Sequence, residues 1–188
     1  MGIYYSFHGR ISALYMGLAT PLFLLIPVIF SRMGVIIPYR LLIFFFAFLI
    51  LSYNIGFIMD GYIIFVSYHC DKIDHFISGF LLTTIGLCFY FYMDKSKEKN
   101  WKLGIWFALF FTMFIAVLFE FAEYFVYLTT DKDPQLNLTT GVVDTMDDLL
   151  VCFISSLVSL VTFSLYFSKG YKIFKYPIID EFCEINHK

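Results

Sequence analysis

Charged residues are scarce in this chain: they make up 15% of its 188 residues, and the formal net charge is −2. A chain so close to neutral lacks the basic surface that nucleic acids bind, so we expect no nucleic-acid partner. Its four cysteines contain no C-x-x-C pair, and nothing in their spacing indicates a disulfide framework or a zinc ribbon. The motifs H-E-x-x-H, G-x-S-x-G and the P-loop are also absent, so the common signatures of soluble enzymes do not apply.

Apolar residues, by contrast, are abundant. They make up 60% of the chain, phenylalanine alone occurs 25 times, and the mean hydropathy is +0.79. Such a composition is typical of polytopic membrane proteins. We therefore predict an all-α transmembrane bundle that forms a single domain over residues 1–188. A spanning helix needs about 20 apolar residues, and five segments qualify: roughly 11–30, 36–58, 75–93, 104–128 and 146–168.

Two further features of the first three segments complete this prediction. No A-x-A-like cleavage site follows residues 11–30, so we expect that segment to be retained as a membrane helix and not removed as a signal peptide. Residues 61–70 are too short to span a bilayer, and we expect them to form an interfacial turn or a re-entrant piece before the third helix.

The positive charges predict how the bundle is oriented. Cytoplasmic loops are enriched in lysine and arginine. Lysines cluster between the third and fourth helices and in the C-terminal tail, at Lys95, Lys97, Lys99, Lys102, Lys169, Lys172, Lys175 and Lys188. This pattern predicts an extracytoplasmic N-terminus and a cytoplasmic C-terminus, which agrees with an odd number of spanning helices.

The acidic residues converge on the opposite, extracytoplasmic side. The pairs have helical spacing, so each pair shares one helix face. Glu120 also lies about 12 Å below the outer end of the fourth helix at Leu128, inside the hydrocarbon region. The candidate ligand set is Asp71 and His75 at the outer end of the third helix, Glu120 and Glu123 in the fourth, and Asp144 and Asp148 at the start of the fifth. We expect Asp74 and Asp147 to lie behind these residues or at the surface.

A carboxylate in the hydrocarbon region costs roughly 2.5–3.5 kcal/mol, so these glutamates should face the bundle interior or a watery cavity. Few cations are available to compensate: Lys72, Lys132 and the histidines His69 and His75. Either some carboxyl groups are protonated or a cation lies among them. Asp, Glu and His donors suit divalent Mn, Mg, Zn or Fe. The alternative is that Asp71 and Asp144 are simply helix N-caps, an interpretation that leaves Glu120 and Glu123 unexplained.

Three polar blocks in this order resemble a known family. They are Asp71-Lys72-x-x-His75-Phe76, Glu120-x-x-Glu123 and Gly141-x-x-Asp144-Thr145-x-x-Asp148. The pattern resembles the YjdF-like bacterial inner-membrane proteins, which are similar to VanZ-like proteins, some of them linked to glycopeptide-antibiotic resistance. The resemblance covers roughly residues 35–165 and implies the same six site residues and a bacterial plasma membrane. The sequence departs from the family at Val143, where an aromatic residue is expected, and at Ser155 and Ser156, where glycines are expected.

Two main functional hypotheses follow. In the first, the protein is a metal-dependent enzyme that acts on a membrane lipid or a lipid-linked cell-envelope precursor, with Glu123 or His75 as the general base. In the second, it is a transporter or binding protein for an ion, a proton or a cationic drug. An accessory membrane subunit, with the acidic residues docking a partner, is a third option. The lack of an acidic path from Glu120 toward the cytoplasmic side favours a one-sided site.

Overall fold

The computed structural model describes residues 24–58, 64–94, 96, 100–129, 133–169 and 178–186. Every secondary-structure element in this part of the chain is a helix, as predicted. The helices are α3 (Ile26–Arg32), α4 (Tyr39–Ile58), α5 (Ile64–Met93), α6 (Trp101–Thr129), α7 (Asn137–Thr140), α8 (Val143–Lys169) and α9 (Ile178–Asn186). Within these described residues, three segments are long and apolar enough to cross a membrane: Asp71–Met93, Trp101–Thr129 and Val143–Lys169. Most of the first predicted helix, residues 11–23, lies outside the described residues.

The third spanning helix differs from its prediction. We expected it to begin near residue 75, after a turn over residues 61–70, but α5 begins at Ile64 and continues without interruption to Met93. The physical reason is that this stretch carries neither glycine nor proline before Gly79, so no residue breaks the helix. Asp71 therefore lies inside a helix, and the N-cap interpretation of this residue is wrong.

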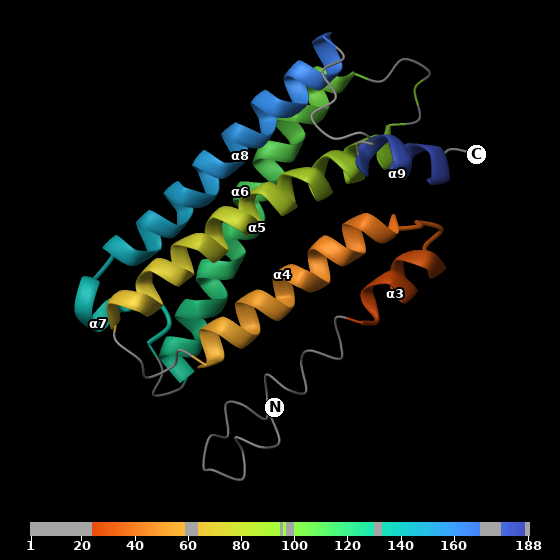
Figure 1. Cartoon of the computed structure of the whole chain (residues 1–188). Helices are drawn as coiled ribbons and strands as arrows, with labels where there is room; N and C mark the ends of the chain where they lie inside the picture. The colour runs from red at the N-terminus through yellow and green to blue at the C-terminus, as the bar shows by residue number, and fades with distance from the viewer. Residues whose placement is uncertain are drawn as a thin grey trace.

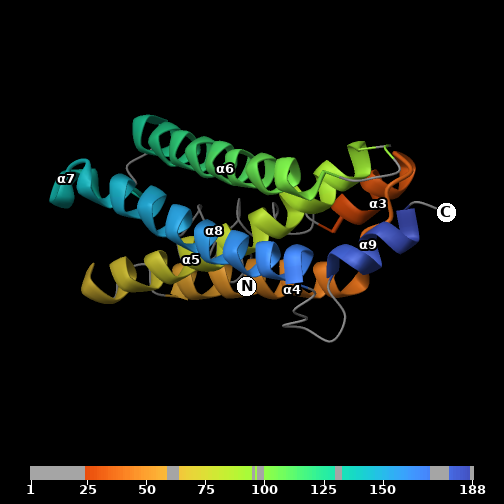
Figure 2. The same ribbon diagram turned by 90° about the horizontal axis from the view of Figure 1, so that it is seen from above.

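Helix α5 is the centre of the described bundle. It contacts α4, α6, α8 and α9, and it lies between α4 and the pair formed by α6 and α8 (Figures 1 and 2). Small residues allow these close contacts: a Cβ atom added to Gly79 would lie 2.6 Å from the carbonyl oxygen of Cys152 on α8. Gly86 approaches the backbone of α6 in a similar way, where its added Cβ would lie 3.0 Å from Ala108 Cα. Such close approach is typical of membrane helices.

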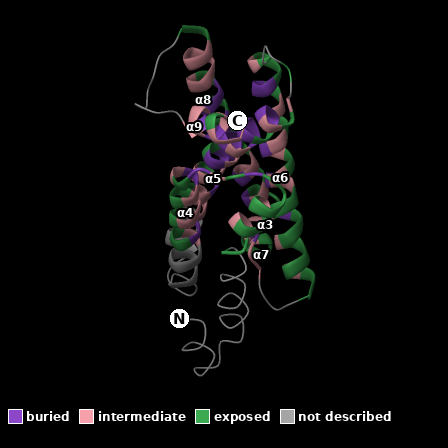
Figure 3. Cartoon of the chain, turned by 90° about the vertical axis from the view of Figure 1, so that its right-hand side faces the viewer, coloured by how far each residue is buried: buried purple, intermediate pink, exposed green. Residues whose placement is uncertain are grey.

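Exposed positions lie on the outside of the bundle, and buried positions gather between the helices (Figure 3). Many of the exposed residues are large and apolar. On α6 alone, Trp106, Phe110, Phe114, Phe121 and Phe125 are all more than half exposed. An apolar surface of this extent would be unfavourable in water, whereas lipid tails solvate it well. The arrangement is that of a helical bundle within a bilayer.

A short amphipathic helix, α9, closes the end of the bundle opposite the acidic residues. Its apolar residues Ile179 and Phe182 are buried. Its last residue, Asn186, accepts a hydrogen bond from Ile36 N (2.7 Å) and donates one to Ile36 O (2.8 Å). These bonds tie the C-terminal segment to the connection between α3 and α4.

Candidate functional site

The ammonium group of Lys72 lies at the centre of the polar cluster. Lys72 Nζ is 2.6 Å from Asp144 Oδ1 and 2.6 Å from Asp148 Oδ1, and 3.4 Å from Asp71 Oδ2. Asp144 and Asp148, which both lie on α8, are about 99% buried. Because α5 is continuous through this region, Lys72 projects from the same helix as Asp71 and reaches across to the first two turns of α8. The ammonium group of Lys72 thus compensates part of the negative charge of the acidic residues.

His75 lies one turn after Asp71 on α5 and is buried. Its Nε2 atom is 3.6 Å from Asp71 Oδ1 and 3.6 Å from Asp148 Oδ1. The ring of Phe119 on α6 packs edge-on against the imidazole, with 5.8 Å between the ring centroids. One ligand atom from each of Asp71, His75 and Asp148 lies within 4.8 Å of the other two.

Glu120 is held in place by a loop that returns along α6. Gln135 is buried, and its Nε2 donates to Glu120 O (3.1 Å) and to Glu120 Oε2 (3.2 Å). The loop itself is fastened by Asp133, which accepts hydrogen bonds from Asn137 N and Leu138 N at the start of α7. Glu120 is also near enough to Asp71 and Asp144 to interact with them electrostatically.

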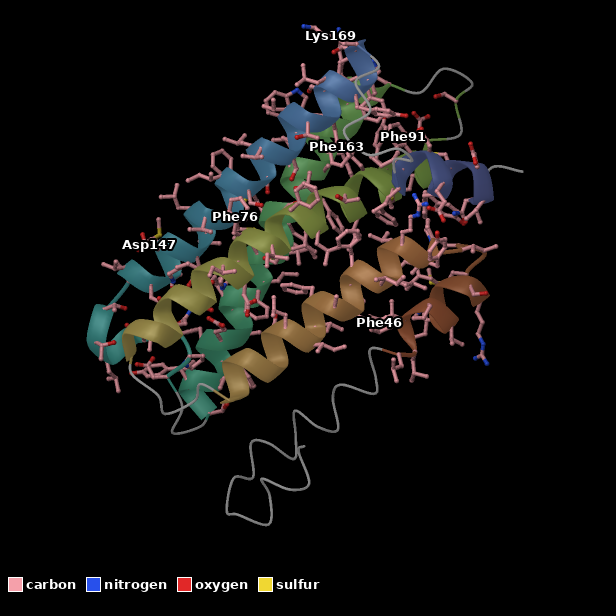
Figure 4. The ribbon with its side chains drawn as sticks, viewed as in Figure 1. Phe46, Phe76, Phe91, Asp147, Phe163 and Lys169 are labelled. Carbon is pink, nitrogen blue, oxygen red and sulfur yellow. The ribbon has the colours of Figure 1, made fainter. Side chains whose placement is uncertain are left out.

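The remaining predicted acids lie at the margin of this cluster. Glu123 is half-buried on α6, three residues after Glu120, and interacts electrostatically with Glu120, Asp144 and Asp148. Asp74 and Asp147 are also half-buried, and Figure 4 shows Asp147 at the outer edge of α8. The structure therefore gathers all six predicted site residues at one end of α5, α6 and α8.

Sequence reasoning missed two members of the site. Lys72 was counted only as one nearby cation, although its place between Asp71 and His75 in the D-K-x-x-H block was a usable signal. Gln135 gave no such signal, because it lies in a turn beside Pro134 and its partner is 15 residues away. Only the path of the loop over α6 brings these two residues together.

A half-open pocket of about 310 Å³ lies beside the cluster, between α6, α7 and α8. Most of its wall is apolar, and its polar groups include Glu120, Gln135 and Thr145. Phe121, Tyr124 and Val142, at its rim, are 63%, 48% and 67% exposed. The full lining comprises Val117, Glu120, Phe121, Tyr124, Gln135, Asn137, Gly141, Val142, Thr145 and Leu149. The pocket thus connects a buried carboxyl group with the apolar outer surface.

The donor set at this end fits a divalent cation. Two carboxylates and one imidazole of the Asp71, His75 and Asp148 group are grouped closely, and these are donors that Mn, Fe and Zn accept. Two further buried carboxyl oxygens, Glu120 Oε1 and Asp144 Oδ2, have no hydrogen-bond partner. Such orphaned oxygens are rare in proteins and indicate a missing donor or ion. Lys72 contacts the same atom, Asp148 Oδ1, that lies nearest His75, so its ammonium group and a bound cation would share this carboxylate.

Below the cluster the helices pack tightly against each other. Thr83, Thr112 and Ser156 each donate to the backbone carbonyl four residues earlier in their own helix, and Ser155 donates to Phe76 O on α5. Their hydroxyl protons are therefore used within the backbone, and the close contact of Gly79 with α8 leaves no room between the two helices there. The described residues thus form a site that is open at one end of the bundle.

Comparison with known proteins assigns the chain to a family. A family model described as a predicted membrane protein, DUF2238, matches residues 2–169. No curated protein and no solved structure gives a significant match. The family description agrees with the three membrane-spanning segments and with the apolar outer surface. The chain is an integral membrane protein and belongs to the DUF2238 family of predicted membrane proteins.

Proposed function

We propose that this protein is a metal-dependent membrane enzyme that acts on a lipid or on a lipid-linked cell-envelope precursor. A bacterial plasma membrane, a site on its extracytoplasmic side and kinship with YjdF-like and VanZ-like proteins are parts of the same proposal. The observation that carries it is the group of Asp71, His75 and Asp148, whose ligand atoms lie within 4.8 Å of one another and of which His75 and Asp148 are buried. The pocket that Glu120 lines at the same end of the bundle opens toward the apolar surface, where a lipid would arrive.

The residues of the acidic cluster have separate roles in this proposal. Asp71, His75 and Asp148 would hold the cation, and the free oxygens of Glu120 and Asp144 lie at the same end of the bundle. A bound divalent cation would polarise a phosphate or ester group. Glu123 lies at the margin of the cluster, where it can accept the proton of an attacking water molecule. Lys72 holds Asp144 and Asp148 in place and offsets part of their charge.

Lipid turnover tests this proposal directly. We would supply the purified protein with Mn²⁺ and with mixed micelles of polyprenyl phosphate or phosphatidylglycerol, and measure the release of water-soluble phosphate. Wild type should release it, and Glu123→Gln should lose at least about 100-fold in rate, the usual contribution of a general base. Glu184→Gln, an exposed acid on α9, is the matched control and should behave like wild type. Equal rates in Glu123→Gln and wild type would refute the role of Glu123.

One observation favours a second candidate, a cation transporter or binding protein. Asp144 and Asp148 each lie 2.6 Å from a cationic group, the ammonium of Lys72. Proteoliposomes with an outward proton gradient would test it through the uptake of Mn²⁺. The closed packing around Gly79 argues for no uptake, and rapid uptake that is lost in Asp144→Asn would favour transport over the enzyme.

A further inference from the structure

We propose that the pocket between α6, α7 and α8 binds an amphipathic lipid through a hydrogen-bond donor, an ammonium or a hydroxyl, at the end of its head group. This inference deepens the proposed function by naming the chemistry of the substrate head group, and it rests on that function only for the idea that the bound lipid is turned over. The binding itself requires neither a metal nor a reaction.

The carboxyl group of Glu120 has one free oxygen. The residue is 96% buried, and it lines the pocket. Gln135 occupies one oxygen, Oε2, and so fixes the position of the carboxyl group. The other oxygen, Oε1, has no hydrogen-bond partner. A buried acceptor without a donor is unfavourable, and a donor brought by a ligand in the pocket would satisfy it.

The charged groups near Glu120 favour some lipid head groups over others. Glu120, which lines the pocket, interacts electrostatically with Asp71 and Asp144. The ammonium group of Lys72 is directed at Asp144 and Asp148. An anionic group would therefore meet like charge at the base of the pocket, whereas an ammonium or hydroxyl group would be attracted. The phosphate of a phospholipid then has to lie nearer the rim, with the terminal donor group reaching Glu120.

The walls of the pocket indicate that the ligand is amphipathic. The walls of the pocket are mostly apolar, and the rim residues Phe121 and Val142 are more than half exposed. This surface continues into the aromatic outer face of α6, which also includes the highly exposed Phe125. An acyl chain can follow that face while the head group enters the pocket. A small water-soluble molecule would leave the apolar walls unused.

Phospholipids with identical acyl chains test this inference, because their head groups differ in donors. Phosphatidylethanolamine carries an ammonium group, phosphatidylglycerol carries hydroxyl groups, and phosphatidylcholine carries no donor. Native mass spectrometry of the chelator-treated full-length protein would measure the retention of each lipid. We expect one or both donor lipids to bind about tenfold more tightly than phosphatidylcholine, as one hydrogen bond to a charged group would give.

Three variants locate the binding. Leu149→Trp fills the pocket and should abolish this preference, whereas Leu150→Trp, at an exposed position that does not line the pocket, should keep it. Glu120→Gln keeps the size of the side chain and should remove most of the preference.

Each possible outcome of the lipid measurements leads to a different conclusion. Preference for phosphatidylethanolamine alone identifies an ammonium head group, and preference for phosphatidylglycerol alone identifies a hydroxyl; either result supports the inference. Equal retention of all three lipids by wild type, or a preference that survives Leu149→Trp, would overturn it. Since the metal has been removed, a failure here leaves the turnover assay unaffected, and a failure of that assay leaves this result unaffected.

Discussion

Lys72 is the residue that makes the acidic cluster compatible with a membrane interior. Two almost fully buried aspartates, Asp144 and Asp148, share its ammonium group at 2.6 Å each. A buried carboxylate without a partner is very unfavourable, so the three residues act as one unit. Asp71, at 3.4 Å, and His75, which contacts Asp71 and Asp148, surround that unit.

Removal of this ammonium group should destabilise the protein strongly. We expect Lys72→Met to lower the free energy of unfolding by about 3–5 kcal/mol, the usual effect of removing one partner of a buried ion pair. Titration with sodium dodecyl sulfate, followed by circular dichroism, would measure this change. Lys102→Met, at an exposed position on α6, is the control and should have little effect. Unchanged stability in Lys72→Met would mean that the ion pairs do not hold the cluster together.

The residue types of the site could be predicted from the sequence, whereas their partners could not. Carboxyl groups at helical spacing within apolar segments were sufficient to select Glu120, Glu123, Asp144 and Asp148. The bond from Gln135 to Glu120 depends on a loop that returns along α6. The pairing of Lys72 with α8 depends on the rotation of α5 about its axis. Neither depends on local sequence.

At the scale of elements, the contact between α5 and α8 positions the site. Gly79 lies one turn beyond His75 and faces the backbone of Cys152, and Ser155 donates to Phe76 O just above it. The two helices are therefore in close contact immediately below the cluster. This contact keeps Lys72 within reach of Asp144 and Asp148.

A methyl group at this contact should separate the two helices. We expect Gly79→Ala to lower the free energy of unfolding by about 1–3 kcal/mol, because the new Cβ would lie 2.6 Å from a backbone oxygen that cannot move independently. The same detergent titration measures it. Ala122→Val adds carbon to an exposed position of α6 and should be close to neutral. If both variants were equally stable, the glycine contact would not be a determinant of packing.

The spanning helices were predictable because their apolar length is set by the bilayer. The predicted segments 104–128 and 146–168 agree with α6 and α8 within about three residues. The predicted start of α5, near residue 75, lies eleven residues after the observed start at Ile64. The prediction is wrong because hydropathy falls where the helix carries its polar residues. A functional polar segment thus resembles a loop when only apolar length is considered.

At the scale of the whole molecule, the two ends of the bundle differ. One end carries the acidic cluster and the pocket, and the other is closed by α9, whose Asn186 pairs with the backbone of Ile36. Nothing in the amphipathic pattern of α9 alone could predict this partner, which is 150 residues away in the sequence. The orientation of the bundle in the membrane stays a prediction from the lysine distribution.

Loss of the Asn186 amide should loosen this second end and leave the site intact. We expect Asn186→Ala to raise the hydrogen-exchange rate of the Ile36 amide by about tenfold, since that amide loses its acceptor. Mass spectrometry of peptic fragments would measure the exchange. Glu184→Ala, an exposed neighbour on α9, should leave it unchanged. Unaltered exchange in Asn186→Ala would show that α9 does not protect this connection.

The proposed function depends on the binding of a divalent metal ion by the cluster. The most direct measurement is elemental analysis of detergent-purified protein, dialysed against Mn²⁺ or Zn²⁺ and then against buffer, for wild type, His75→Gln and Asp147→Asn. His75 belongs to the group of close donors, whereas Asp147 lies at the outer edge of α8. We expect about one metal ion per chain in wild type and Asp147→Asn, and almost none in a folded, monodisperse His75→Gln. Wild type without metal, or His75→Gln with as much metal as wild type, would contradict it.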